Sequence, residues 1–167
     1  MNEALRWARD RLERVTPLKT DCGRVCGAVC CRSAEGEETG MLLFPGEEAL
    51  FAGRPGWALR PAALGTLAVC SGVCDREQRP LACRLFPLLP VLREDGVHIA
   101  VDARARGVCP LTRQGLGAFS PEFREAVRAS GVRLAEDEEQ AAFLRLLTAQ
   151  QDEWTRLRRQ FGGEKNV

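Results

Sequence analysis

The 167-residue sequence predicts an α+β fold, in which a small loop-rich centre with short strands lies between an N-terminal helix and a long C-terminal helix. Both ends of the chain repeat apolar side chains at helical spacing, whereas the middle has only short apolar runs separated by Gly and Pro. A chain of this length suits one domain. We therefore expect residues 1–167 to form a single domain.

The elements of the first two thirds of the chain are short. Apolar residues recur every three or four positions over residues 3–16, which predicts an amphipathic helix. Short strands are expected around Leu42, Leu67 and Ile99, where brief apolar runs stand between turn residues. A short helix is expected through residues 47–51.

A polar turn is expected through Ser33 and Gly36, and the last third of the chain is helical. Ser120 followed by Pro121 is typical of a helix start, because the serine side chain can cap the helix and proline fits its first position. Gly131 is expected to end this helix. A long helix then follows over about residues 136–161.

The charge balance argues against a nucleic-acid or membrane-surface role. Lys and Arg number 24 and Asp and Glu number 23, giving a net charge of +1. Residues 1–10 are charged and lack the apolar core of a signal peptide, and the apolar run 85–92 is short and contains two prolines. We therefore expect a cytoplasmic protein with no membrane contact and no nucleic-acid partner. Its protein partner or substrate stays unknown.

Eight cysteines are the most informative feature of the sequence. They make up less than the share of a small disulfide-stabilised scaffold, and in a reducing compartment clustered cysteines favour metal binding or catalysis. The set contains no Cys-x-x-Cys redox motif. The expected metal ligands fall into three groups along the chain: Cys22, Cys26, Cys30 and Cys31; Cys70, Cys74 and Cys83; and Cys109. We expect the three groups to converge in space, because metal sites gather ligands from distant segments of a chain.

The spacing of the first group raises the question of how many metals it serves. In a straight helix Cys22 and Cys30 would lie roughly 12 Å apart, too far for one zinc ion with bonds of about 2.3 Å. Either the segment bends, which Gly23 and Gly27 permit, or it serves more than one metal. Cys31 faces away from Cys30 in any regular structure, so the pair indicates different metals or a polynuclear cluster.

The cysteine pattern resembles a family of bacterial cysteine-cluster proteins, described as zinc- or iron-chelating domains and as Fe–S-cluster-containing proteins or oxidoreductases. The resemblance covers about residues 18–112 and depends on the number of cysteines, on the pair that ends the first group, and on the stretch Arg79-Pro80-x-x-Cys83-Arg84-x-Phe86-Pro87. The sequence departs from the family at residues 75–78, where an aromatic residue is expected and none is present. The resemblance implies a metal site but no particular reaction.

These observations leave two classes of function open. In the first, the thiolates hold an iron–sulfur cluster with a redox or group-transfer-assisting role, and Arg79 and Arg84 offset the negative charge of the cofactor site. In the second, they hold structural zinc in an adaptor or interaction module. Both place a metal-stapled core at residues 18–112 and a helical extension at residues 113–167. His98 is expected to be a structural strand residue.

Overall fold

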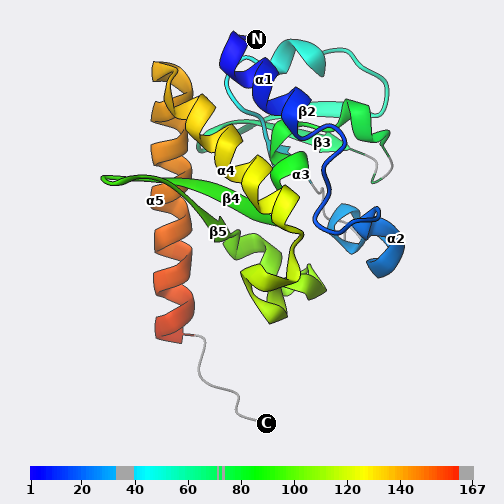
Figure 1. Ribbon diagram of the computed structural model, residues 1–167. Coiled ribbons are helices and arrows are strands. Elements are labelled where there is room, and N and C mark those ends of the chain that lie inside the picture. Colours follow the sequence, from blue (N-terminus) through cyan, green and yellow to red (C-terminus); the bar gives the residue numbers. More distant parts are fainter. Residues whose placement is uncertain (33–39, 71, 73, 162–167) are drawn as a thin grey trace.

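A computed structural model describes residues 1–32, 40–70, 72 and 74–161, and confirms the α+β fold (Figure 1). The turn expected through Ser33 and Gly36 lies outside the described residues. The helices are α1 (Glu3–Arg11), α2 (Cys22–Cys26), α3 (Leu81–Leu85), α4 (Pro121–Ala135) and α5 (Glu138–Phe161). The strands are β1 (Gly40–Leu42), β2 (Trp57–Ala62), β3 (Gly65–Cys70), β4 (Leu88–Arg93) and β5 (Gly96–Val101). Short 3₁₀ turns join them: Val29–Cys31, Glu48–Leu50, Arg76–Gln78, Ala103–Gly107, Pro110–Gln114 and Leu116–Ala118.

The strands form two small antiparallel sheets. One has the order β1-β3-β2, and the other is the β4–β5 hairpin. Strands β1, β3 and β5 contain the expected positions Leu42, Leu67 and Ile99, so these predictions are confirmed. Two strands were missed because neither shows the alternation of a half-buried strand. The first four residues of β4 are all buried, and the last three of β2, which include Pro61, are all exposed.

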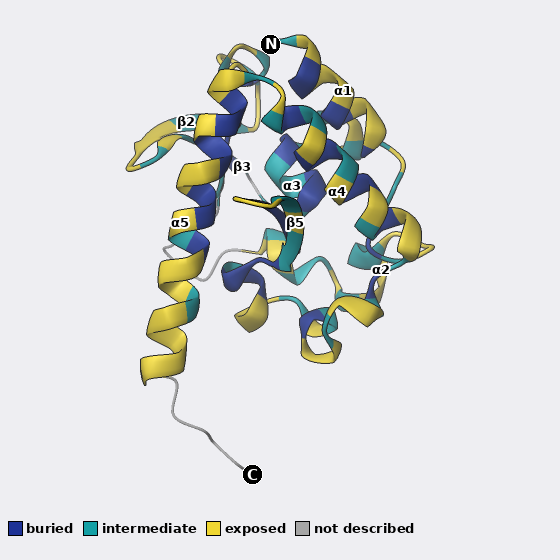
Figure 2. Cartoon of the chain, turned by 60° about the vertical axis from the view of Figure 1, so that its left-hand side comes forward, coloured by how far each residue is buried: buried dark blue, intermediate teal, exposed yellow. Residues whose placement is uncertain are grey.

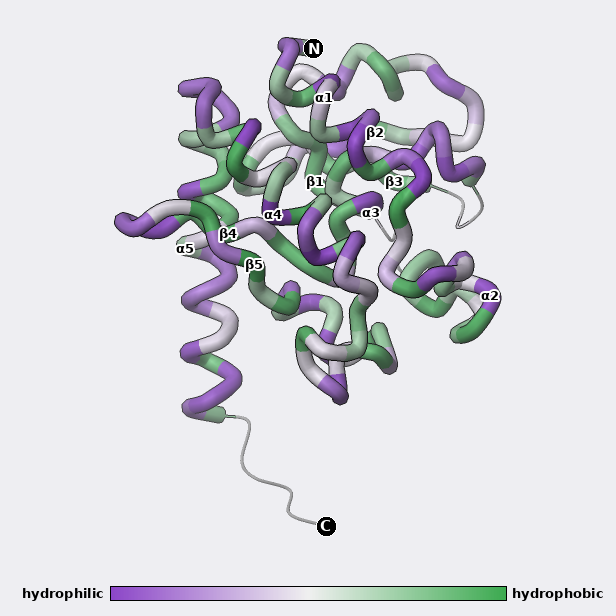
Figure 3. The backbone as a smooth tube through the Cα atoms, in the orientation of Figure 1, coloured by the Kyte–Doolittle hydropathy of each residue, from purple (hydrophilic) through white to green (hydrophobic). Residues whose placement is uncertain are grey.

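The hydrophobic core lies between the β4–β5 hairpin and helices α1, α4 and α5. Helix α4 packs on α1 and on both strands of the hairpin, while α5 packs on β4 and α4. Figure 2 shows the buried stripes of these helices facing inward, and Figure 3 shows β4 and β5 as mainly hydrophobic stretches. The main cluster draws residues from both sides of position 113, including Leu85 and Leu144. The division of the chain at that position stays a prediction.

The expectation that Gly131 ends a helix is wrong. Helix α4 continues through Gly131 to Ala135. A Cβ atom at Gly131 would lie 2.5 Å from Cβ of Pro90 and 2.7 Å from Cγ1 of Val97. The glycine therefore allows α4 to approach the hairpin closely, which sequence periodicity does not distinguish from a helix end.

The first helix is shorter than the expected 3–16, because α1 ends at Arg11. The carbonyls of Leu12, Glu13 and Val15 accept hydrogen bonds from the guanidinium of Arg76, at 3.3, 2.7 and 2.5 Å. A side chain from a distant segment thus satisfies backbone groups that a longer helix would have paired internally. Among the described helices, none is long and apolar enough to cross a membrane.

Candidate metal centre

All eight cysteines line one cavity of about 230 Å³, so the three groups converge as the sequence analysis expected. Each cysteine is a free thiol. A single water molecule needs roughly 10–15 Å³ of such space. The cavity therefore has room for a cluster or for more than one metal ion. Its wall also contains Phe86 of the stretch that carries the resemblance, and apolar side chains that no sequence motif marked: Val25, Val29, Met41, Trp57, Val108 and Leu111.

The first group sits on a segment that bends back on itself. The side chain of Asp21 caps α2 by accepting a hydrogen bond from the backbone N–H of Gly23 at 3.1 Å. Cys22 and Cys26 stand one helical turn apart. The helix then ends at Gly27, whose φ of 67° is left-handed, as is the φ of 54° at Ala28. The segment is therefore not a straight helix, and the geometric objection to a shared site disappears.

The second group is carried by the end of β3 and the chain that follows it. Cys70 is the last residue of β3, where it pairs with Trp57 of β2. Gly72, with φ of 84°, passes directly against the other cysteine segment, since a Cβ atom there would lie 2.7 Å from the carbonyl oxygen of Cys31. Only glycine fits this close approach. The backbone at Cys31 is therefore in contact with Gly72, which lies between Cys70 and Cys74 in the sequence.

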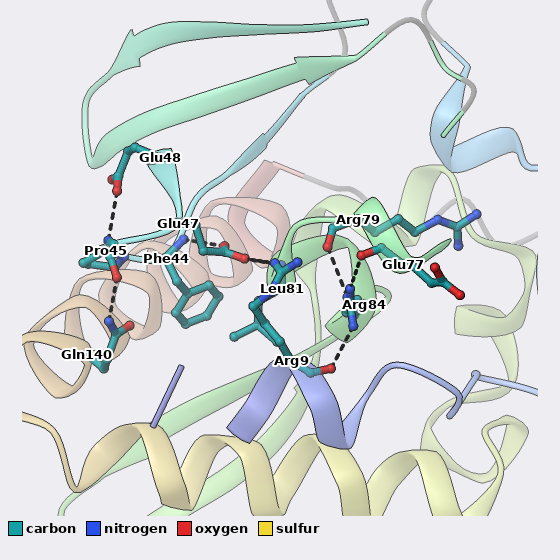
Figure 4. Close-up of polar contacts among 11 residues, drawn as sticks. Arg9, Phe44, Pro45, Glu47, Glu48, Glu77, Arg79, Leu81, Arg84 and Gln140 are labelled. Carbon is teal, nitrogen blue, oxygen red and sulfur yellow. Dashed lines mark hydrogen bonds and ion pairs between the residues drawn. The ribbon is translucent and has the colours of Figure 1, made fainter. Parts of the chain in front are cut away.

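Cys83 is held in place by buried polar contacts around α3. The carboxylate of Glu47, which is fully buried, pairs with Arg9 and accepts hydrogen bonds from the backbone N–H groups of Leu81 (2.9 Å) and Phe44 (3.1 Å) (Figure 4). Burial raises the pKa of Glu47, and the Arg9 guanidinium opposes this. The first turn of α3 is thereby fixed to α1 and to the turn after β1.

Arg84 is a positioning residue in this structure. Its guanidinium donates hydrogen bonds to the carbonyls of Arg79 (3.1 Å), Arg9 (2.8 Å) and Glu77 (2.7 Å), as Figure 4 shows. These bonds hold the turn before Cys83 against α1. Arg84 also lines the cavity, and its predicted role in offsetting cofactor charge stays a prediction.

Cys109 is presented by two 3₁₀ turns. Its backbone N–H donates to the carbonyl of Ala105 at 2.7 Å, and its carbonyl accepts from the Thr112 hydroxyl at 2.7 Å. The N–H groups of Leu111 and Thr112 are directed at its sulfur and lower the pKa of the thiol, although burial raises it more. Backbone N–H groups aimed at a sulfur stabilise the thiolate form, which is the form that binds metals.

Charge interactions identify one set of neighbouring thiols, because such interactions weaken with distance. Burial raises the pKa of Cys83, and Cys31, Cys74 and Cys70 raise it further. Burial also raises the pKa of Cys74, where Arg79 opposes the effect and Cys70 and Cys31 add to it. We call this group the α3 set: Cys31, Cys70, Cys74 and Cys83.

The remaining thiols interact with one another in the same way. Burial raises the pKa of Cys22, with further contributions from Cys26 and Cys109. A hydrogen bond to Cys31 raises the pKa of Cys30, and burial, the charge of Cys31 and then the charges of Cys22 and Cys26 raise it further. Cys26 also raises the pKa of Cys109. We call this group the α2 set: Cys22, Cys26, Cys30 and Cys109.

The two sets are in contact at the adjacent residues Cys30 and Cys31. The sulfurs of Cys30 and Cys31 lie 3.9 Å apart. The hydrogen bond from Cys30 lowers the pKa of Cys31 to about 6, and Arg79 lowers it as well, against the effect of burial. Cys31 is therefore the thiol of this pair that is ionised at neutral pH.

Four arginines line the cavity, two of which the sequence analysis missed. Arg79, which was predicted, is hydrogen-bonded to Cys74. The charge of Arg76 lowers the pKa of Cys22, against the larger effect of burial. The other two are Arg84 and Arg104, and the guanidinium of Arg104 donates a hydrogen bond to the carboxylate of Asp102 at 2.6 Å. In a chain with so many arginines, no local pattern marks the ones that reach a cavity.

His98, which was expected to be a structural strand residue, is bonded to a residue outside the cysteine groups. His98 pairs with Asp95 in the β4–β5 turn, at 2.9 Å. Within the described residues, no group of three or more Cys, His, Asp and Glu side chains stands in an arrangement that could hold a metal ion. The donor chemistry nevertheless suits a thiophilic metal, since eight free thiols and four guanidinium groups surround one cavity.

Comparison with known protein families, curated proteins and solved structures finds no match.

Proposed function

We propose that this protein binds metal through its clustered cysteine thiolates, and that the metal is an iron–sulfur cluster with a redox or group-transfer-assisting role. The observation that carries the proposal is the convergence of all eight free thiols on one cavity. Thiolates from distant segments that gather in this way are typical of cluster and zinc sites. On this proposal the thiols move closer together when they bind.

The arginines and the apolar wall support a charged cluster. A thiolate-ligated cluster carries negative charge; the Arg79 guanidinium is hydrogen-bonded to Cys74, and the charge of Arg76 acts on Cys22. Apolar walls exclude water and strengthen these interactions. When bound, the cluster would supply electron transfer or Lewis-acid chemistry. The resemblance to Fe–S-cluster-containing proteins favours iron over zinc.

Structural zinc in an adaptor or interaction module is the second candidate. The observation that favours it is the lack of apolar anchoring around α2. Neither α2 nor the 3₁₀ turn Val29–Cys31 has a buried residue. A metal that fixes such a segment contributes directly to its folding.

Anaerobic purification of the full chain tests the proposal and separates the two candidates. An iron–sulfur protein would be brown, absorb visible light through charge transfer and contain iron and acid-labile sulfide, whereas a zinc protein would be colourless. Cys83→Ser should lower the metal content, and the neighbouring Ala82→Ser should leave it unchanged because it adds a hydroxyl without removing a thiol. Metal-free wild-type protein that takes up neither iron and sulfide nor zinc would contradict metal binding.

A further inference from the structure

We propose that the eight cysteines form two separate four-thiolate metal sites, the α2 set (Cys22, Cys26, Cys30 and Cys109) and the α3 set (Cys31, Cys70, Cys74 and Cys83). The inference rests on the proposed metal binding and adds the number of sites and their ligands. Four thiolates are the ligand count of structural zinc and of common iron–sulfur clusters. Eight thiols around one cavity would otherwise serve one larger cluster or leave some cysteines unused.

The adjacent cysteines carry the first step. The 3.9 Å between the sulfurs of Cys30 and Cys31 would also suit two ligands of one ion, since bonds of about 2.3 Å at a tetrahedral angle place sulfurs roughly 3.8 Å apart. Whether Cys30 and Cys31 bind the same metal is therefore judged from the other thiols around each of them. Apart from its neighbour Cys31, the thiols whose charge acts on Cys30 are Cys22 and Cys26, whereas Cys31 acts on Cys74 and Cys83.

The backbone supports the same division. Gly72, between Cys70 and Cys74, lies against the carbonyl oxygen of Cys31, so a residue between two members of the α3 set contacts a third. The α3 set thus comes from the end of β3, the chain after it, α3 and the last residue of the turn Val29–Cys31. The α2 set comes from α2, the same turn, and Cys109.

Each set also has its own arginine. Arg76 is fixed by three carbonyls after α1 and lies near Cys22 of the α2 set. Arg79 is hydrogen-bonded to Cys74 of the α3 set and acts on Cys31. Two sites of net negative charge side by side repel each other, and a guanidinium beside each one offsets that repulsion.

Cobalt(II) titration of the metal-free full chain, kept anaerobic, tests the division. Cobalt bound by four thiolates absorbs strongly in the visible range, and the bound metal can be counted after exchange against a chelator. Wild-type protein should retain about two equivalents. Cys109→Ser and Cys83→Ser should each retain about one.

Double variants built on the adjacent cysteines give the decisive result. Cys30→Ser with Cys109→Ser removes ligands of one set and should retain about one equivalent, as should Cys31→Ser with Cys83→Ser. The crossed pairs, Cys30→Ser with Cys83→Ser and Cys31→Ser with Cys109→Ser, should retain none. Circular dichroism checks that the helical content, to which α4 and α5 contribute most, persists in each variant. If a variant with Cys109→Ser loses its helical content, Cys22→Ser takes the place of that substitution, and Cys74→Ser takes the place of Cys83→Ser in the same way.

The outcomes separate this inference from the proposed function. Retention of a single equivalent by wild-type protein, or equal loss from matched and crossed pairs, would overturn the two-site division and leave metal binding intact. Uptake of no metal by wild-type protein under any of these conditions would overturn both.

Discussion

The helical side of the protein and the α2 side are stabilised in different ways. Figures 1 and 2 show α5 and α2 at opposite sides of the molecule. Leu5, Phe123 and Leu144 on the helices are fully buried, and burying each such side chain stabilises a fold by about 1.5–3 kcal/mol. In contrast, the described residues 18–32 include none that is buried. Apolar packing therefore explains one side, and the cysteines must account for the other.

The largest loss of unfolding free energy is expected from Glu47→Gln, which disrupts a buried ion pair away from the α2 side. The substitution leaves Arg9 without its charged partner in a buried position, which costs on the order of 3–5 kcal/mol of unfolding free energy. Chemical denaturation followed by circular dichroism measures this loss. Glu48→Gln is the matched control, because Glu48 is only partly buried and accepts a single backbone hydrogen bond from Gly46. Equal stability of the two variants would contradict the role given to the buried pair.

A smaller effect is expected from Gly131→Ala. The added methyl group would overlap Pro90 and Val97, and overpacking of this kind costs roughly 1–3 kcal/mol, while better helix propensity returns up to about 1 kcal/mol. We expect a net loss of about 1 kcal/mol in unfolding free energy, with metal content unchanged. Gly117→Ala is the control, since a Cβ there has open space around it. A stabilised Gly131→Ala variant would show that α4 and the hairpin are not closely packed.

The last prediction concerns the reactivity of two thiols in the unmodified protein and involves no change in stability. In metal-free protein Cys31 should react with iodoacetamide faster than Cys83 at pH 7, because its pKa is lowered to about 6 while burial raises that of Cys83. The Cys31 rate should fall as the pH drops through 6, since the thiolate is then protonated. Peptide mass spectrometry measures both rates. A Cys31 rate that rises only above pH 8 would contradict the arrangement of Cys30, Cys31 and Arg79.

Sequence reasoning succeeded where a long periodic pattern or a single residue type carries the signal. The long helical periodicity after Ser120 and the expected cysteine convergence both appear in the structure. It failed where a tertiary contact determines where a helix ends. Gly131 lies inside α4 because Pro90 and Val97 leave no room for a larger side chain there. Helix α1 ends before the predicted residue 16, and Arg76 donates hydrogen bonds to the backbone carbonyls that follow it. Neither partner is recognisable from the local sequence.

The central claim is that metal–thiolate bonds order the α2 side, and hydrogen exchange with and without metal tests it most directly. Backbone amides of residues 20–32 should lose protection when metal is removed, because the cysteines then no longer hold this segment, which has no buried residue of its own. Amides of α4 and α5 should stay protected, since apolar packing holds them. Equal protection of residues 20–32 in both states would contradict the account.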